Sequence, residues 1–69
     1  MTRPETTLER LARRVRAEYL EMPGLQLTAD QAARLLGLEA GECARLLGAL
    51  VAEGFLLQSR GRYLRTDLV

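Results

Sequence analysis

The sequence predicts a small, mainly α-helical domain in which three helices are followed by a β-hairpin, with a short upstream segment that could complete a three-stranded antiparallel sheet. Two segments open with a capping box and continue with apolar residues at helical spacing. A third segment has the same spacing and ends at Gly54, after which the apolar residues recur at every second position. A chain of 69 residues forms one small domain, so residues 1–69 are expected to fold as a unit.

The first helix is expected at about residues 7–21. Thr6 and Glu9 form the capping box at its start, and a proline followed by Gly24 ends it. One face of this helix is apolar and comprises Leu8, Leu11, Ala12, Val15, Tyr19 and Met22. The opposite face carries arginines, namely Arg10, Arg13 and Arg14. These arginines are interpreted as a solvated face, with contact to phosphates as the alternative.

The second and third helices are expected at about residues 29–36 and 40–53. Thr28 and Gln31 form the capping box of the second helix. Gly37 is suited to the left-handed conformation that commonly follows a helix end, so the chain is expected to turn there. The buried face of the third helix is expected to comprise Cys43, Leu46, Leu47, Leu50 and Val51.

A hairpin is expected at about residues 55–66, with its turn at residues 59–62, where Gly61 can adopt a positive φ. Alternation predicts that three apolar side chains face the core, namely Phe55, Leu57 and Leu64. The side chains predicted to face outward are Gln58, Tyr63 and Arg65. Leu25 and Leu27 form a short extended segment that could pair with the hairpin and supply a third strand.

Ala33 is followed by Gly37 four positions later, and Cys43 and Leu46 lie six and nine positions after that glycine. This spacing resembles the helix-turn-helix motif, because the small residue lets the helices cross closely and the glycine permits the turn. The hairpin behind the helices resembles the wing of the winged helix-turn-helix family. The resemblance implies a DNA-binding, transcription-regulator-type domain whose third helix enters the major groove.

The resemblance also assigns roles to individual residues. The outward positions that touch base edges in the family are here Glu39, Ala40, Gly41, Ala44, Arg45 and Gly48. Of these, Arg45 is suited to bind guanine through two guanidinium nitrogens. The wing offers three arginines for phosphate contacts, namely Arg60, Arg62 and Arg65. The small and acidic residues of the third helix depart from the family pattern, so backbone contacts are expected to dominate over base readout.

The net charge of +1 is unevenly distributed along the chain. Residues 1–20 carry five arginines against three acidic residues, and residues 58–69 carry three arginines against one aspartate. Residues 21–57 carry two arginines against five acidic residues. The predicted helix-turn-helix is therefore the acidic part of the chain, whereas DNA-binding domains usually concentrate positive charge on the recognition surface.

A protein-interaction or self-association module is the alternative function. The outward stripe of the third helix presents little side-chain bulk, because glycine and alanine recur along it. A glycine inside a helix costs up to about 1 kcal/mol relative to alanine, and a surface without bulk lets another backbone approach closely. The residues expected to contact a protein partner or a second copy are Gly41, Ala44, Gly48 and Ala52.

The residue types present argue against an enzyme. The chain has no histidine, and its one cysteine, Cys43, lies on the apolar stripe, where a buried hydrophobic role is expected. No metal-ligand spacing or phosphate-binding loop is present, so no metal, cofactor or small-molecule substrate is expected. A lone cysteine and the lack of a long apolar run predict a cytoplasmic protein without membrane contact.

Overall fold

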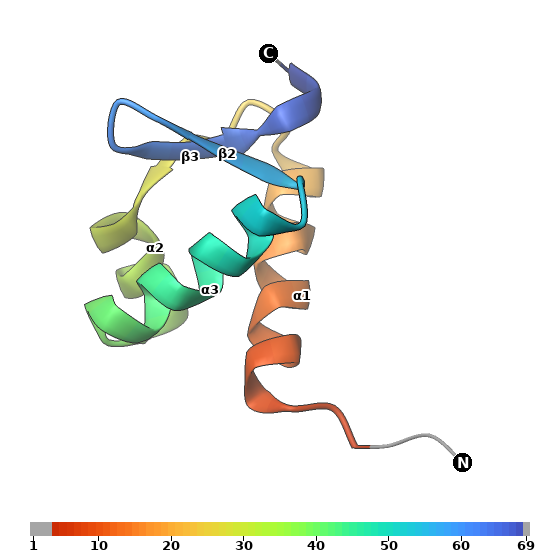
Figure 1. Ribbon diagram of the computed structural model, residues 1–69, viewed down its shortest axis with the longest axis vertical. Coiled ribbons are helices and arrows are strands. Elements are labelled where there is room, and N and C mark those ends of the chain that lie inside the picture. The colour runs from red at the N-terminus through yellow and green to blue at the C-terminus, as the bar shows by residue number, and fades with distance from the viewer. Residues whose placement is uncertain (1–3, 69) are drawn as a thin grey trace.

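The computed structural model describes residues 4–68, and the ends of the predicted domain, residues 1–3 and 69, lie outside the described residues. Within this range the chain folds into three helices and a three-stranded antiparallel sheet (Figure 1). The elements are α1 (Thr7–Glu21), β1 (Leu27–Thr28), α2 (Ala29–Leu36), α3 (Ala40–Ala52), β2 (Leu56–Ser59), β3 (Arg62–Arg65) and a final 3-10 turn (Thr66–Leu68). The predicted mainly helical class is confirmed, and the third helix ends one residue earlier than expected.

The capping box predicted for α1 is present. The Thr6 hydroxyl accepts a hydrogen bond from the Glu9 N–H at 3.1 Å, and the Glu9 carboxylate accepts one from the Thr6 N–H at 3.1 Å. The middle of the helix is buried through Val15 and Tyr19. The ends of the predicted apolar face are not buried, because Leu8 is 50% exposed and the N-terminal part of α1 extends past α3 (Figure 1).

The turn between α2 and α3 forms at Gly37, as expected. Gly37 has a φ of +69°, and the Leu38 N–H donates to the Ala33 carbonyl at 2.9 Å, which closes the end of α2. The small side chain of Ala33 is buried at this crossing. The residues of α3 that contact the core without any exposed surface are Cys43, Leu46, Leu47 and Leu50. The predicted apolar stripe is therefore confirmed for these four positions.

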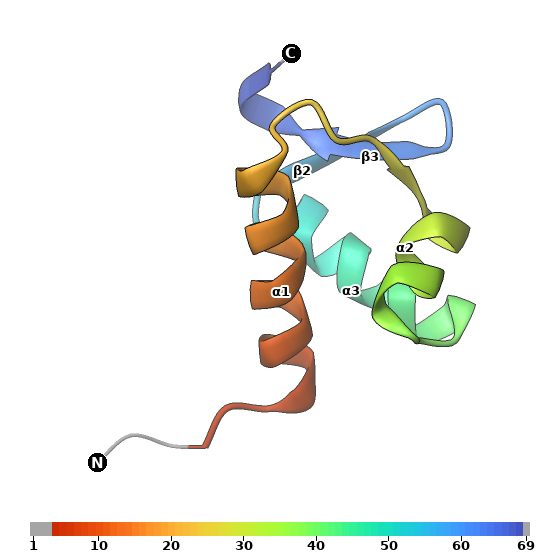
Figure 2. The same ribbon diagram turned by 180° about the vertical axis from the view of Figure 1, so that it is seen from behind.

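At the end of α3 the chain reverses direction and enters β2. Gly54 has a φ of +83°, and its N–H donates to the Val51 carbonyl at 3.0 Å. The Phe55 N–H donates to the Leu50 carbonyl at 3.0 Å. These two bonds form a Schellman motif, which satisfies carbonyls at the helix end and reverses the chain direction. The sheet consequently lies across the C-terminal ends of α1 and α3 (Figure 2).

The strand order is β1-β3-β2, so a third strand is present and β3 is central. This strand includes Leu27 of the predicted segment, whereas Leu25 lies before it. The turn and the strand pairing of the hairpin are as expected, but the opposite face of the hairpin packs against the helices. Leu56 and Tyr63 are buried against the helices, whereas Leu57 pairs with Leu64 on the opposite face of the sheet. The prediction that Leu57 and Leu64 face the core and that Tyr63 faces outward is wrong. Because side chains alternate between the two faces of a strand, packing the other face against the helices exchanges all the predicted inward and outward positions.

Tyr19 connects α1 to the central strand. Its side chain has no exposed surface, its hydroxyl donates to the Tyr63 carbonyl at 2.7 Å, and its ring meets the Phe55 ring edge-on at 6.3 Å. Burial raises the pKa of Tyr19 to about 12, an effect partly offset by a backbone hydrogen bond from Leu27. The neutral phenol therefore serves as a hydrogen-bonded part of the core.

The turn at Gly37 gives a first prediction. Gly37→Val places a β-branched residue at positive φ, and we expect a loss of about 2 kcal/mol in the free energy of unfolding. Gly48→Ala is the matched control, because a Cβ at Gly48 meets no atom within 4 Å and its φ is not positive. This control should gain about 0.5–1 kcal/mol. Thermal unfolding of wild type and both variants measures these differences. A melting temperature of Gly37→Val equal to that of wild type would contradict the assignment of the turn to Gly37.

The core hydroxyl gives a second prediction. The pKa of Tyr19 is about 12 in the folded chain against its ordinary value of 10.0. The contribution of the neutral phenol to the free energy of unfolding is therefore complete below pH 10 and is lost as pH rises towards 12. Tyr19→Phe should lower the free energy of unfolding by about 1 kcal/mol at neutral pH. It should also make stability fall less steeply between pH 10 and 12.

Urea unfolding at several pH values measures both effects. Burial also raises the pKa of Cys43, but this contribution is common to both proteins and cancels in the difference. If the free energy of unfolding fell equally steeply between pH 10 and 12 in wild type and in Tyr19→Phe, the phenol of Tyr19 would not be held neutral by the fold.

Candidate nucleic-acid interface

The structure brings two of the four predicted DNA-contacting arginines together. Arg62 pairs with Ser59 across the hairpin and lies on the face of the sheet opposite to Tyr63. On this outward face lies a polar hollow of about 410 Å³. Its lining residues are Gln26, Ser59, Arg60, Arg62 and Leu64. Two guanidinium groups, an amide and a hydroxyl therefore surround one exposed hollow, which is chemically suited to an anion.

The tip of the hairpin has an uncommon backbone conformation. Arg60 has a φ of +53° and the following Gly61 a φ of +78°. Positive φ at both positions matches the right-handed twist of the strands, and Asn or Gly usually occupies the first of them. Arg60 is the one non-glycine residue with positive φ among residues 4–68. An arginine there costs conformational energy that asparagine or glycine would avoid.

The charges of Arg60 and Arg62 are not neutralised by the described part of the chain. The ion pairs formed within residues 4–68 involve other arginines, and both hairpin residues are exposed. An exposed guanidinium without an acidic neighbour keeps its full attraction for an anion. The hairpin tip is therefore the clearest basic surface that the described residues form.

Arg65 does not belong to this surface, which corrects the prediction. It shares the inward face of β3 with Tyr63, and its side chain is only 17% exposed. Its Nε donates to an Asp67 carboxylate oxygen at 2.9 Å, and a second guanidinium nitrogen bonds the other oxygen. A bidentate pair of this kind holds the guanidinium in place. The physical reason is that the face of the hairpin carrying Leu56 and Tyr63 packs against the helices, and Arg65 lies on that face.

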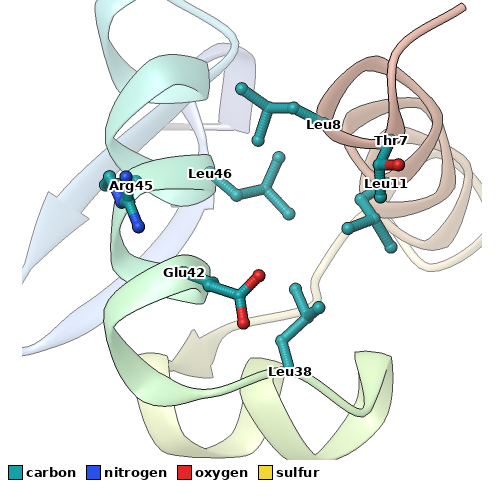
Figure 3. Close-up of a pocket in the computed structure, with 7 residues that line it drawn as sticks. All are labelled: Thr7, Leu8, Leu11, Leu38, Glu42, Arg45 and Leu46. Atoms are coloured by element: carbon teal, nitrogen blue, oxygen red, sulfur yellow. The ribbon is translucent and has the colours of Figure 1, made fainter.

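Arg45 lies apart from the hairpin arginines, in a groove of about 280 Å³ between α1 and α3 (Figure 3). The groove is lined by Thr7, Leu8, Leu11, Leu38, Glu42, Arg45 and Leu46. Leu46 points from α3 towards α1, and Leu8 and Leu11 point back from α1 (Figure 3). Arg45 and Glu42 are the charged residues of this lining. The sequence did not predict this groove, because it depends on where α1 crosses α3.

The small residues of α3 are exposed, as expected. They are Gly41, Ala44, Gly48 and Ala52. A Cβ atom built at Gly41 or at Gly48 meets no atom within 4 Å, so packing within the chain does not require glycine at either position. The surface adjoins the groove through Arg45, which lies on α3 between the two glycines. A role of these residues as an interface stays a prediction.

The arginines of α1 interact with other parts of the chain. Arg13 donates to the Glu5 carboxylate at 2.8 Å, and Arg14 donates to the Leu35 carbonyl at 3.2 Å. Arg10 lies 3.9 Å from the same Glu5 carboxylate and is largely exposed. Arg10 and Arg13 are thus both largely exposed and fit the interpretation as a solvated face, whereas Arg14 also links α1 to the end of α2.

The reactive groups of the chain are buried. Cys43 has no exposed surface, and burial raises the pKa of its thiol. Within residues 4–68, no group of three or more Asp, Glu, Cys or His side chains is placed to hold a metal ion. None of the helices in this part of the chain has the length and apolar character needed to cross a membrane.

No family model matches the sequence, and neither the curated proteins nor the solved structures contain a match to it. The arrangement of the described side chains is therefore the basis for assigning a function. In that arrangement, the exposed pair Arg60 and Arg62 and the α1–α3 groove are the two surfaces with a defined chemistry.

Proposed function

We propose that this chain is a winged helix-turn-helix module that binds DNA mainly through phosphate contacts made by the β2–β3 hairpin. The observation that carries the proposal is the pairing of Arg60 and Arg62 in one exposed polar hollow, without acidic partners in the described residues. Phosphates are bound most strongly by guanidinium groups that are free to form charge-assisted hydrogen bonds. The Ser59 hydroxyl and the Gln26 amide add neutral groups that bond phosphate oxygens.

The arrangement of the helices supports the same proposal. A tight turn at Gly37 joins α2 to α3, the small Ala33 is buried at their crossing, and a three-stranded sheet follows. In a winged module α3 would lie in the major groove and the hairpin would reach the adjacent backbone. The proposed module is non-enzymatic, requires no cofactor, and acts in the cytoplasm as a transcription-regulator-type domain.

The proposed binding has a limited capacity to read sequence. Arg45 is the one exposed arginine of α3, and it could bind guanine. Glu39 and Glu42 lie at the N-terminal end of the same helix. Their negative charges interact favourably with the positive end of the helix dipole there but repel phosphates. Affinity is therefore expected to be electrostatic, with at most one base position read strongly.

A protein-interaction module is the second candidate, and one observation favours it. Gly41 and Gly48 are exposed, and neither would meet a neighbouring atom through an added Cβ. The folded monomer gains nothing from glycine at these positions, whereas a helix packed against them would gain a closer approach. Under this function a protein partner or a second copy occupies the α3 surface.

The hairpin proposal predicts the salt dependence of DNA binding. Replacing Arg60 and Arg62 together by glutamine should remove most of the affinity for random duplex DNA. The slope of log affinity against log salt concentration should fall by about 2, since each phosphate contact contributes about 0.9. Arg65→Gln is the matched control on the same strand and should leave the slope nearly unchanged, because Asp67 already neutralises that guanidinium.

A second variant separates binding from folding. Arg60→Asn removes the charge but suits the positive φ at the hairpin tip, so it should raise the melting temperature while lowering the slope by about 1. Fluorescence anisotropy with labelled duplex at several salt concentrations measures the slope. A double variant that keeps the wild-type slope would remove the hairpin from the proposal.

A further inference from the structure

We propose that the groove between α1 and α3 is the site at which a second copy of this chain docks around a twofold axis. The inference rests on the second candidate function, for which it names the partner and the contact, and it does not require DNA binding. Two grooves would face each other, so that each copy supplies the apolar side chain that fills the groove of the other. An interface of this type uses the same surface on both subunits.

The groove has an apolar floor and an incompletely covered rim. Leu46 forms the floor and has no exposed surface, while Leu11 and Leu38 are half-buried beside it. Leu8 lies at the rim and exposes 50% of its surface (Figure 3). Apolar surface of this kind is stabilised by about 25 cal/mol for each Å² that a partner removes from water. Leu8 of a second copy is therefore a suitable occupant for the open side of the groove.

The charges of the groove identify the second copy as the occupant. Glu42 and Arg45 are the acidic and basic residues of its lining, and none of the ion pairs within residues 4–68 involves either of them. They lie three positions apart on α3, which is about 4.5 Å along the helix axis. When the α3 helices of two copies run antiparallel, Glu42 of each copy meets Arg45 of the other. One surface thus carries both halves of a complementary pair.

The surface next to the groove permits this approach. Gly41 and Gly48 flank Arg45 on α3 and present no side chains, so two α3 helices can come close enough for the charged groups to meet. The dimer would cover Arg45 and leave the hairpin exposed, because Arg60 and Arg62 line a different hollow. Self-association would then compete with base readout by α3 and not with phosphate contacts of the hairpin.

Sedimentation of the whole chain without DNA, over a concentration series up to the millimolar range, tests the proposal. We expect a monomer–dimer equilibrium for wild type and at least a tenfold weaker dimer for Leu8→Glu. Leu20→Glu is the matched control, because Leu20 is also an exposed leucine of α1, at 59%, but lies outside the groove. The control should dimerise like wild type. A wild type that stays monomeric throughout the series would overturn the proposal, whatever its affinity for DNA.

Exchanging the charges of Glu42 and Arg45 tests whether the α3 helices of the two copies run antiparallel, and this test does not depend on Leu8. Glu42→Arg alone and Arg45→Glu alone should each weaken the dimer, because each places like charges opposite one another. The double variant should restore it, since the two charges then exchange places on both copies. Circular dichroism at low concentration verifies that each variant is folded. A dimer that none of these substitutions weakens would show that copies associate through another surface and would overturn the proposal.

Discussion

The buried contact of Tyr19 with β3 determines where the remaining parts of the structure lie. The hydroxyl of Tyr19 donates to the Tyr63 carbonyl, and its ring meets the Phe55 ring. This contact fixes the sheet against the C-terminal half of α1. A hydroxyl without an acceptor inside the core would cost about 1–3 kcal/mol, so α1 and the sheet have little freedom to shift relative to one another.

The same contact decides which hairpin residues reach solvent. With the backbone of Tyr63 against α1, the Tyr63 side chain is buried and its neighbours Arg62 and Leu64 lie on the other face of β3. Arg62 thereby joins Arg60 in the polar hollow, and Arg65 is drawn inward to Asp67. The basic surface proposed to contact phosphates is in this sense a consequence of how a tyrosine on the first helix is buried.

The helices could be predicted closely because their ends are encoded locally. Thr6 and Thr28 begin capping boxes, and Gly37 and Gly54 adopt the left-handed conformations that end α2 and α3. The buried face of the hairpin could not be predicted, because three apolar residues in succession, 55–57, fit either face of a strand. The choice between the faces depends on Tyr19, which lies more than 35 residues upstream.

In the candidate site, too, features encoded locally could be predicted and features that depend on distant segments could not. Arg60 and Arg62 could be placed at an exposed turn from the sequence, since Gly61 marks the turn and the tip of a hairpin is solvent-accessible. The pairing of Arg14 with the Leu35 carbonyl and the groove beside Arg45 could not be predicted, because they arise from segments far apart in the chain. Contacts of this kind are set by how the helices cross, which the spacing of apolar residues leaves open.

The most direct test of the proposed function is to follow the backbone amide signals of the ¹⁵N-labelled chain by NMR while random duplex DNA is added at low salt. The hairpin model predicts that the largest shift changes occur at residues 59–64 and at Gln26, with smaller changes along α3. Changes that centre on α3 and leave the hairpin signals in place would contradict the model, as would a spectrum that DNA does not alter at all.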